Sequence, residues 1–167
     1  MTTTVARPPG INRILVSTAL GYSLIWLNLN AVVVSLEPIS ASLRADPNLS
    51  HWIVGSTYLG MAALILPFGG LADRLGPRRV FTAGIMLFAG SSLMSGLSPN
   101  VTWMLAGRAI EGVAAAILVG SAMAYLAVSF GDHPGRGQEI GRWTVVTAFA
   151  AGLGGALGGV LAAVGWR

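Results

Sequence analysis

GGLADRLGPRR, residues 69–79, lies between two long apolar runs of the chain. It gathers three glycines, the acid Asp73 and the arginines Arg74, Arg78 and Arg79 in one short stretch. A charge cluster of this density is too costly to place in the hydrocarbon of a bilayer. The stretch is therefore predicted to be a turn at the membrane surface, where the chain leaves the bilayer and re-enters it.

The composition also indicates a membrane protein. The 167 residues are 54% hydrophobic and only 10% charged, with a mean hydropathy of +0.72, whereas soluble domains carry about 25% charged residues. The expected fold class is therefore an all-α membrane protein. The chain has no cysteine, its histidines His51 and His133 are isolated, and its arginines are scattered between apolar runs. No cofactor, metal site, enzyme activity or nucleic-acid partner is expected.

Five segments are long and apolar enough to cross a bilayer, which takes roughly 20 residues of helix. Residues 1–13 are interpreted as an N-terminal tail and residues 14–167 as a transmembrane helical domain. Pro67, near the end of the second segment, is expected to kink that helix. The predicted spans cover residues 14–36, 52–71, 80–97, 101–128 and 143–164.

Arginine placement predicts the orientation of the chain in the membrane, because cytoplasmic loops carry an excess of basic residues. With alternating spans, one side has only Arg44 and Arg167. The N-terminus is therefore expected in the cytoplasm and the chain in the cell membrane. The other side collects seven arginines: Arg7, Arg13, Arg74, Arg78, Arg79, Arg136 and Arg142.

Three motifs, in the same order, resemble the drug:proton antiporter branch of the major facilitator superfamily. Residues 69–79 match the signature G-x-L-a-D-r-x-G-r-[KR]-[KR] between that family's second and third helices almost letter for letter. Residues 108–112 resemble its fourth-helix motif R-x-x-q-G, and residues 150–159 resemble its fifth-helix motif g-x-x-x-G-P-x-x-G-G. The resemblance implies part of a secondary active transporter, with proton-coupled efflux of drug-like or amphipathic small molecules.

The resemblance also implies a role for the loop. Asp73 would contact a helix N-terminus in the other half of the transporter and lock one access state, since an anion is favoured at that end of the helix dipole. The simpler alternative is a topological anchor whose arginines meet anionic membrane lipid. The residues of this conformational-switch loop are Gly69, Asp73, Arg74, Gly76, Arg78 and Arg79.

The chain departs from the family pattern in several places. Gly155 replaces the motif proline, Glu111 stands where the family more often has Gln, and residues 27–30 lack the acid that the first helix often carries. Five spans are also one short of a six-helix half. The chain is therefore expected to be an N-terminal fragment that lacks its C-terminal half and is inactive alone. A small membrane protein that acts by helix–helix association is the alternative.

Arg108 and Glu111, followed by Gly112, lie within the fourth predicted span. Positions i and i+3 share a helix face, and charges inside a bilayer are expected to face a cavity or each other. Arg108 and Glu111 are interpreted as a proton-coupling pair, in which Arg108 holds Glu111 ionised until a proton or cationic substrate arrives. A neutralised structural pair that pins helices together is the alternative.

The fifth predicted span carries two stripes of small residues, and such stripes allow close approach of helices. Gly154 and Gly158 form one stripe, and Gly155 and Gly159 belong to the other. The family resemblance implies that this surface packs against the missing half. A dinucleotide-binding fingerprint is not expected, because a membrane span flanks the glycines and the acid that such a fingerprint needs about 20 residues later is not in the sequence.

Four further residues are candidates for a substrate path. Asn28 and Asn30 are polar residues in the middle of the first span, and they could either line the path or bond to a neighbouring helix. Trp26 and Tyr58 could contact aromatic or cationic substrates, although membrane packing is the more ordinary role for such side chains.

Overall fold

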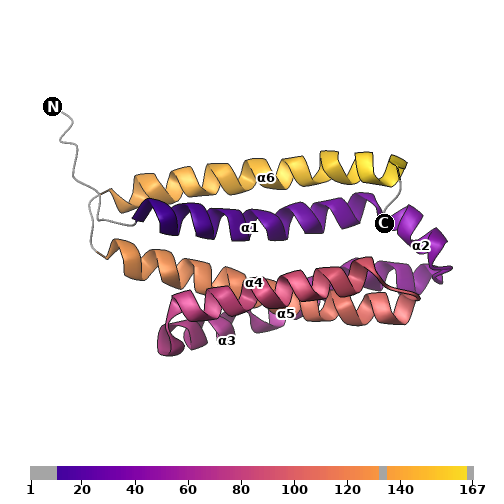
Figure 1. Ribbon diagram of the computed structural model, residues 1–167, viewed down its shortest axis with the longest axis horizontal. Coiled ribbons are helices and arrows are strands. Elements are labelled where there is room, and N and C mark those ends of the chain that lie inside the picture. Colours follow the sequence, from indigo (N-terminus) through magenta and orange to yellow (C-terminus); the bar gives the residue numbers. More distant parts are fainter. Residues whose placement is uncertain (1–10, 132–134, 165–167) are drawn as a thin grey trace.

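The computed structural model describes residues 11–131 and 135–164, and in that part of the chain the regular structure is α-helix (Figure 1). The predicted all-α fold class is confirmed. Most of the predicted tail, His133 and Arg167 lie outside the described residues. The described helices are α1 (Ile11–Val34), α2 (Leu36–Ser42), α3 (Pro47–Leu75), α4 (Pro77–Gly96), α5 (Val101–Phe130) and α6 (Arg136–Val164).

Each of the five predicted spans corresponds to one long helix. Among the described residues, α1, α3, α5 and α6 are long and apolar enough to cross a membrane, whereas the 20-residue α4 is less apolar. Helix α3 begins earlier than predicted, at Pro47, because the side chain of Asp46 accepts a hydrogen bond from the backbone of Asn48 and caps the helix. Pro67 lies inside α3 and does not end it.

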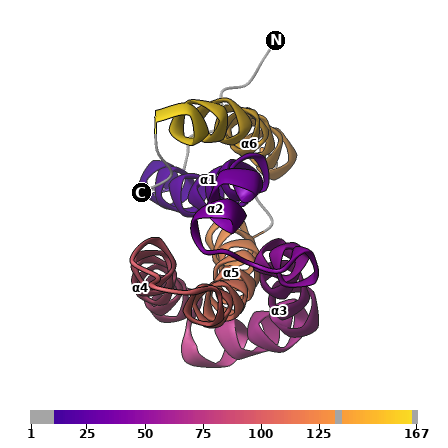
Figure 2. The same ribbon diagram turned by 90° about the vertical axis from the view of Figure 1, so that its right-hand side faces the viewer.

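Two groups of helices meet at α5, as the end-on view in Figure 2 shows. Helices α3 and α4 both pack on α5, and α6 packs on α1, while α1 contacts α5 over a smaller area. Buried side chains from α1, α4 and α5 form the central core, among them Ile25, Phe81, Phe88 and Leu118. Helix α5 is therefore the central element of the bundle.

Glycines allow α5 to approach α3 closely. A side chain at Gly112 would collide with the backbone of Thr57, and one at Gly120 would lie 2.8 Å from the backbone nitrogen of Gly69. Small residues at a helix interface bring backbones together and increase van der Waals contact, which is what favours helix association in a bilayer. Gly69 of the loop signature therefore lies at a packing contact.

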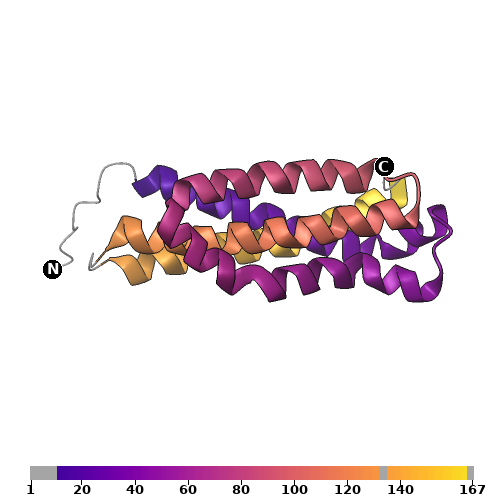
Figure 3. The same ribbon diagram turned by 90° about the horizontal axis from the view of Figure 1, so that it is seen from below.

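The two ends of the bundle differ in charge. Figure 1 and Figure 3 show the α3–α4 junction, the start of α1, the end of α5 and the start of α6 at one end, with α2 and the α4–α5 turn at the other. Arg44 lies at the α2 end. The junction end carries the other described arginines outside the membrane core: Arg13, Arg74, Arg78, Arg79, Arg136 and Arg142.

Gly76 separates α3 from α4. Its φ is 91° and its ψ is 122°, a backbone conformation that residues other than glycine rarely adopt. Apart from its immediate chain neighbours, no described residue has an atom within 4 Å of the position that a Cβ would take. The requirement for glycine at this point of the signature is therefore set by backbone conformation rather than by space.

We expect Gly76→Ala to lower the free energy of unfolding by about 1–3 kcal/mol, because alanine would be strained in this conformation. Gly90→Ala is the matched control, since Gly90 is exposed in the middle of α4 and its Cβ would also meet nothing within 4 Å. The control should be neutral or stabilising by up to about 1 kcal/mol. Denaturant titration of both variants in detergent measures the difference, and equal stability would contradict the argument.

Candidate functional site

The charged pair within α5 is almost completely removed from solvent. Arg108 Nη1 lies 2.6 Å from Glu111 Oε2, and the side chains are 1% and 0% exposed. The two residues are one helical turn apart, so α5 alone sets their relative position. A buried ion pair needs further hydrogen bonds to offset the loss of hydration, and neighbouring helices supply them.

Helix α3 anchors the arginine from one side. Arg108 Nε donates to the carbonyl of Ile53 at 3.2 Å, and Thr57 Oγ1 donates to the carbonyl of Arg108 at 3.0 Å. The close approach at Gly112 brings α3 within reach of these groups. Gly112 thus allows α3 to come close enough to bond to Arg108 of the same motif, because a larger side chain at position 112 would separate the two helices.

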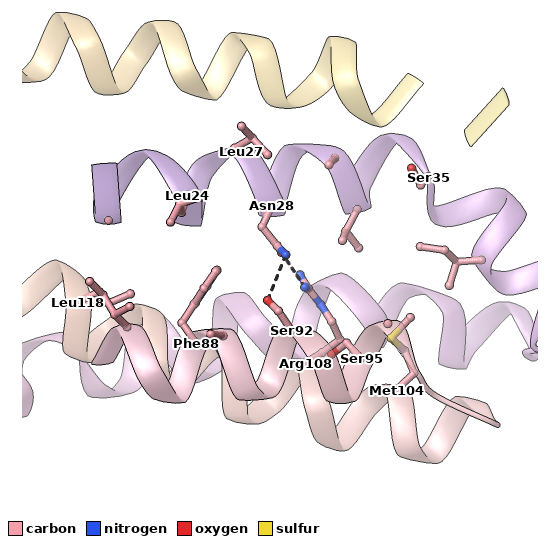
Figure 4. Close-up of a pocket in the computed structure, with 17 residues that line it drawn as sticks. Leu24, Leu27, Asn28, Ser35, Phe88, Ser92, Ser95, Met104, Arg108 and Leu118 are labelled. Atoms are coloured by element: carbon pink, nitrogen blue, oxygen red, sulfur yellow. Dashed lines mark hydrogen bonds between the residues drawn. The ribbon is translucent and has the colours of Figure 1, made fainter. Parts of the chain in front are cut away.

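Helices α1 and α4 complete a closed ring of hydrogen bonds. Arg108 Nη1 donates to Asn28 Oδ1 at 2.9 Å, Asn28 Nδ2 donates to Ser92 Oγ at 3.4 Å, and Ser92 Oγ donates to Glu111 Oε1 at 2.8 Å. The ion pair closes the ring. Figure 4 shows Asn28 of α1 facing Ser92 and Arg108. We call Arg108, Glu111, Asn28 and Ser92 the polar ring.

A cavity of about 490 Å³ lies beside the polar ring, between α1, α4 and α5. Asn28, Ser92 and Arg108 reach its wall, whereas Glu111 is not among the lining residues. Most of the lining is apolar, including Leu24 and Phe88. Mostly apolar walls with a few polar groups are typical of sites that bind small molecules.

The other candidate path residues lie elsewhere. The side-chain amide of Asn30 donates to the carbonyl of Trp26 in its own helix at 2.7 Å. Trp26 packs at the edge of the core beside Tyr22. Tyr58 is 38% exposed. Of the four candidates, Asn28 is the one that lines this cavity.

Sequence reasoning missed Ser92 and Thr57. Both are small hydroxyl residues inside apolar spans, and such residues usually bond to a carbonyl of their own helix. Their partners here are on other helices, as the bonds to Glu111 and Arg108 show. A serine opposite a buried carboxylate could have been suspected only after α4 and α5 were known to be adjacent.

The loop signature is remote from the polar ring. Asp73, Arg74, Arg78 and Arg79 are all exposed at the junction end of the bundle. In the described part of the chain, Asp73 has no ion pair or hydrogen-bond partner. Its carboxylate is therefore available to a group that the structure does not contain.

The glycine stripes of α6 require a correction. Gly154 and Gly158 do not lie on a face left for another half of the molecule, because a Cβ at either position would come within about 2.6 Å of the α1 backbone at Leu27 or Ala31. The hydroxyl of Ser35 also donates to the carbonyl of Gly158 at 3.1 Å. In contrast, among the described residues a Cβ at Gly155 would meet nothing within 4 Å, and one at Gly159 would only touch the side chain of Val34.

The structure thus defines a helical membrane protein with a charged pair buried beside a mostly apolar cavity. Comparison with known proteins identifies the family, since the sequence pattern of the Major Facilitator Superfamily matches residues 18–167. The chain belongs to this family of membrane transporters.

Several curated relatives carry names that refer to drugs or antibiotics. The methylenomycin A resistance protein of Bacillus subtilis is 32% identical over 92% of this chain and 33% of its own length. The multidrug resistance protein Stp of Mycobacterium tuberculosis is 32% identical over 92% of this chain and 29% of its own. The cephamycin export protein CmcT of Amycolatopsis lactamdurans is 34% identical over 92% of this chain and 32% of its own. The chain spans about a third of the length of these relatives.

We expect Arg108→Met to lower the free energy of unfolding by about 3–5 kcal/mol, because it leaves the Glu111 carboxylate buried without its cation. Adding Glu111→Gln to this variant should recover part of the loss, since the neutral amide carries no unpaired charge. Arg142→Met is the control, because Arg142 forms an ion pair with Glu139 but is 67% exposed; its loss should be at most about 1 kcal/mol. Denaturant titration in detergent measures the free energy of unfolding of each variant. Similar losses for Arg108→Met and Arg142→Met would contradict the interpretation of Arg108 and Glu111 as a buried ion pair.

Proposed function

We propose that this chain works as part of a proton-coupled exporter of drug-like or amphipathic small molecules, and that it does not transport alone. The polar ring is the observation that carries the proposal. It buries an ionisable carboxylate that is bonded to α4 through Ser92 and linked to α1 through Arg108, beside a cavity that suits a small apolar ligand.

The relatives support the substrate class. Their names refer to an antibiotic, to several drugs and to export of a cephamycin. These are small organic molecules, and the cavity beside the polar ring is lined mainly by apolar side chains with a few polar groups. The match of chemical character favours an amphipathic substrate over a simple ion or a sugar.

Proton exchange at Glu111 would alter the polar ring directly. A proton on either carboxylate oxygen removes the negative charge that pairs with Arg108 and removes an acceptor from the ring. Arg108 would then be a buried cation without a counter-charge, which is costly, and one of its nitrogens, Nη2, already has no hydrogen-bond partner among the described residues. The arrangement with the lowest free energy therefore depends on whether Glu111 carries a proton.

The exposed switch loop and the exposed face of α6 support the proposal that another helical bundle of the transporter packs against this chain. Asp73 is unpartnered in the described structure, and α6 leaves large apolar residues such as Phe149 and Val160 more than 60% exposed. In a transporter of this family, alternating access requires one repeat or bundle to move against another. Asp73 and the open face of α6 are surfaces on which such a partner would act.

The proposal includes a cell-membrane location with the junction end of the bundle in the cytoplasm, where positively charged loops are favoured. The chain is free of cysteine, so single cysteines can report the orientation. We expect Pro99→Cys to react with a membrane-impermeant maleimide in intact cells, and Leu75→Cys to react only after the cells are opened. Both positions are exposed in the structure. Labelling in intact cells at position 75 but not at position 99 would show that the orientation is the opposite of the proposed one.

We expect Glu111 to exchange a proton when the pH of the medium changes. Infrared difference spectra of the purified chain, taken between a low and a high pH, should show a protonated-carboxyl band that changes with pH, and this band should be absent in Glu111→Gln. The structural alternative predicts no such band from Glu111. Glu139→Gln is the control, because Glu139 is paired with an exposed arginine on α6 outside the polar ring.

Transport is tested in a chimera, in which this chain replaces the equivalent third of the Bacillus subtilis methylenomycin A resistance protein. If the chimera exports a dye in response to a pH gradient, Glu111→Gln should abolish the response to the gradient while substrate binding remains. The unfused chain in vesicles should show no gradient-driven flux. Export by the unfused chain would contradict the proposal that the chain does not transport alone. A normal pH response of the Glu111→Gln variant would contradict the proposed proton coupling through Glu111.

A further inference from the structure

We propose that a second cavity, at the junction end of the bundle, binds an anionic phospholipid through its phosphodiester group. This cavity measures about 460 Å³ and lies between the start of α1, the start of α4 and the end of α5. Arg13 and Ser17 line it from α1, Arg78 and Phe81 from α4, and Tyr125 from α5. The proposal does not depend on transport or on proton exchange at Glu111.

Two unpaired arginines give the cavity its charge. Arg13 and Arg78 come from different helices and are both exposed, and neither has an ion pair or hydrogen-bond partner from its side chain within the described residues. None of the described residues that line the cavity is acidic. Guanidinium groups bind phosphate oxygens through paired hydrogen bonds, so two of them from two helices can hold one phosphodiester between them.

Hydroxyl groups add neutral polar contacts. Ser17 is exposed and its hydroxyl donates to the carbonyl of Ile14 at 3.1 Å. Tyr125 contributes a phenol from the end of α5. Hydroxyls can turn to donate to a phosphate or a glycerol oxygen. The cavity wall thus combines the cations and the hydroxyls that a lipid headgroup would use.

The apolar surface below the arginines distinguishes a lipid from free phosphate. On α1, the exposed residues continue from Arg13 and Ser17 to Leu20, which is 61% exposed and lies about 10 Å further along the helix at 1.5 Å per residue. On α4, Ile85 lines both this cavity and the larger one beside the polar ring. The wall therefore changes from charged to apolar in the direction of the bilayer interior, as an acyl chain requires.

The alternative is that these arginines act only as part of a diffuse positive surface. Such a surface contributes about 1 kcal/mol per arginine near an anionic leaflet, and each arginine at this end would then contribute equally. Arg74 separates the two explanations. It is exposed at the same junction and has no ion pair in the described structure, but it does not line the cavity.

The experiment is native mass spectrometry of the purified 167-residue chain with dioleoylphosphatidylglycerol and, separately, dioleoylphosphatidylcholine. We expect preferential binding of the anionic lipid, weakened about tenfold or more in Arg13→Gln and in Arg78→Gln. Arg74→Gln should bind like the unchanged chain. Arg13 lies outside the switch loop, so its variant remains informative if Arg78→Gln folds poorly.

Three outcomes would overturn the proposal. Equal losses in all three arginine variants would mean a diffuse charged surface. Equal binding of phosphatidylglycerol and phosphatidylcholine would mean that no anionic headgroup is selected. Displacement of the lipid by an equal concentration of inorganic phosphate would assign the cavity to a free anion. None of these results depends on Glu111, so the proposal and the transport function fail or succeed separately.

Discussion

The structure depends on the burial of one ion pair inside α5. Arg108 and Glu111 cannot be hydrated where they lie, so the surrounding helices must supply their hydrogen bonds. Helix α3 supplies a carbonyl and a hydroxyl, α1 an amide, and α4 a serine. The central place of α5 follows from this requirement together with its small residues, because each neighbour has to come within hydrogen-bond distance.

Close packing and polar bonding support each other in this bundle. Between α5 and α3, the absence of a side chain at Gly112 permits the approach that lets Thr57 and Ile53 reach Arg108. Between α6 and α1, Gly154 and Gly158 play a similar part, and Ser35 bonds to the carbonyl of Gly158. Without a hydrophobic driving force between helices in lipid, such contacts have to provide much of the association energy.

The fold could be predicted from the sequence, because the loop signature, the apolar spans and the family order of the motifs all agree. The pairing of Arg108 with Glu111 follows from their spacing on one helix. The rest of the polar ring depends on which helices are neighbours. Asn28 and Asn30 looked equivalent in sequence, yet residues two apart on a helix face different directions, and only Asn28 meets Arg108. The glycines of α6 likewise did not indicate which neighbour they approach.

Asn28 also lies at the seam between the two groups of helices. Helices α1 and α6 form one tightly packed unit, α3, α4 and α5 form the other, and the contact between α1 and α5 is comparatively small. The amide of Asn28 is bonded on both of its sides across this seam, to Arg108 and to Ser92. Its two bonds therefore add a polar connection to the apolar contacts that hold α1 against α4 and α5. A change in the charge of Glu111 would reach α1 through this one amide, because Arg108 and Ser92 are each bonded both to Glu111 and to Asn28.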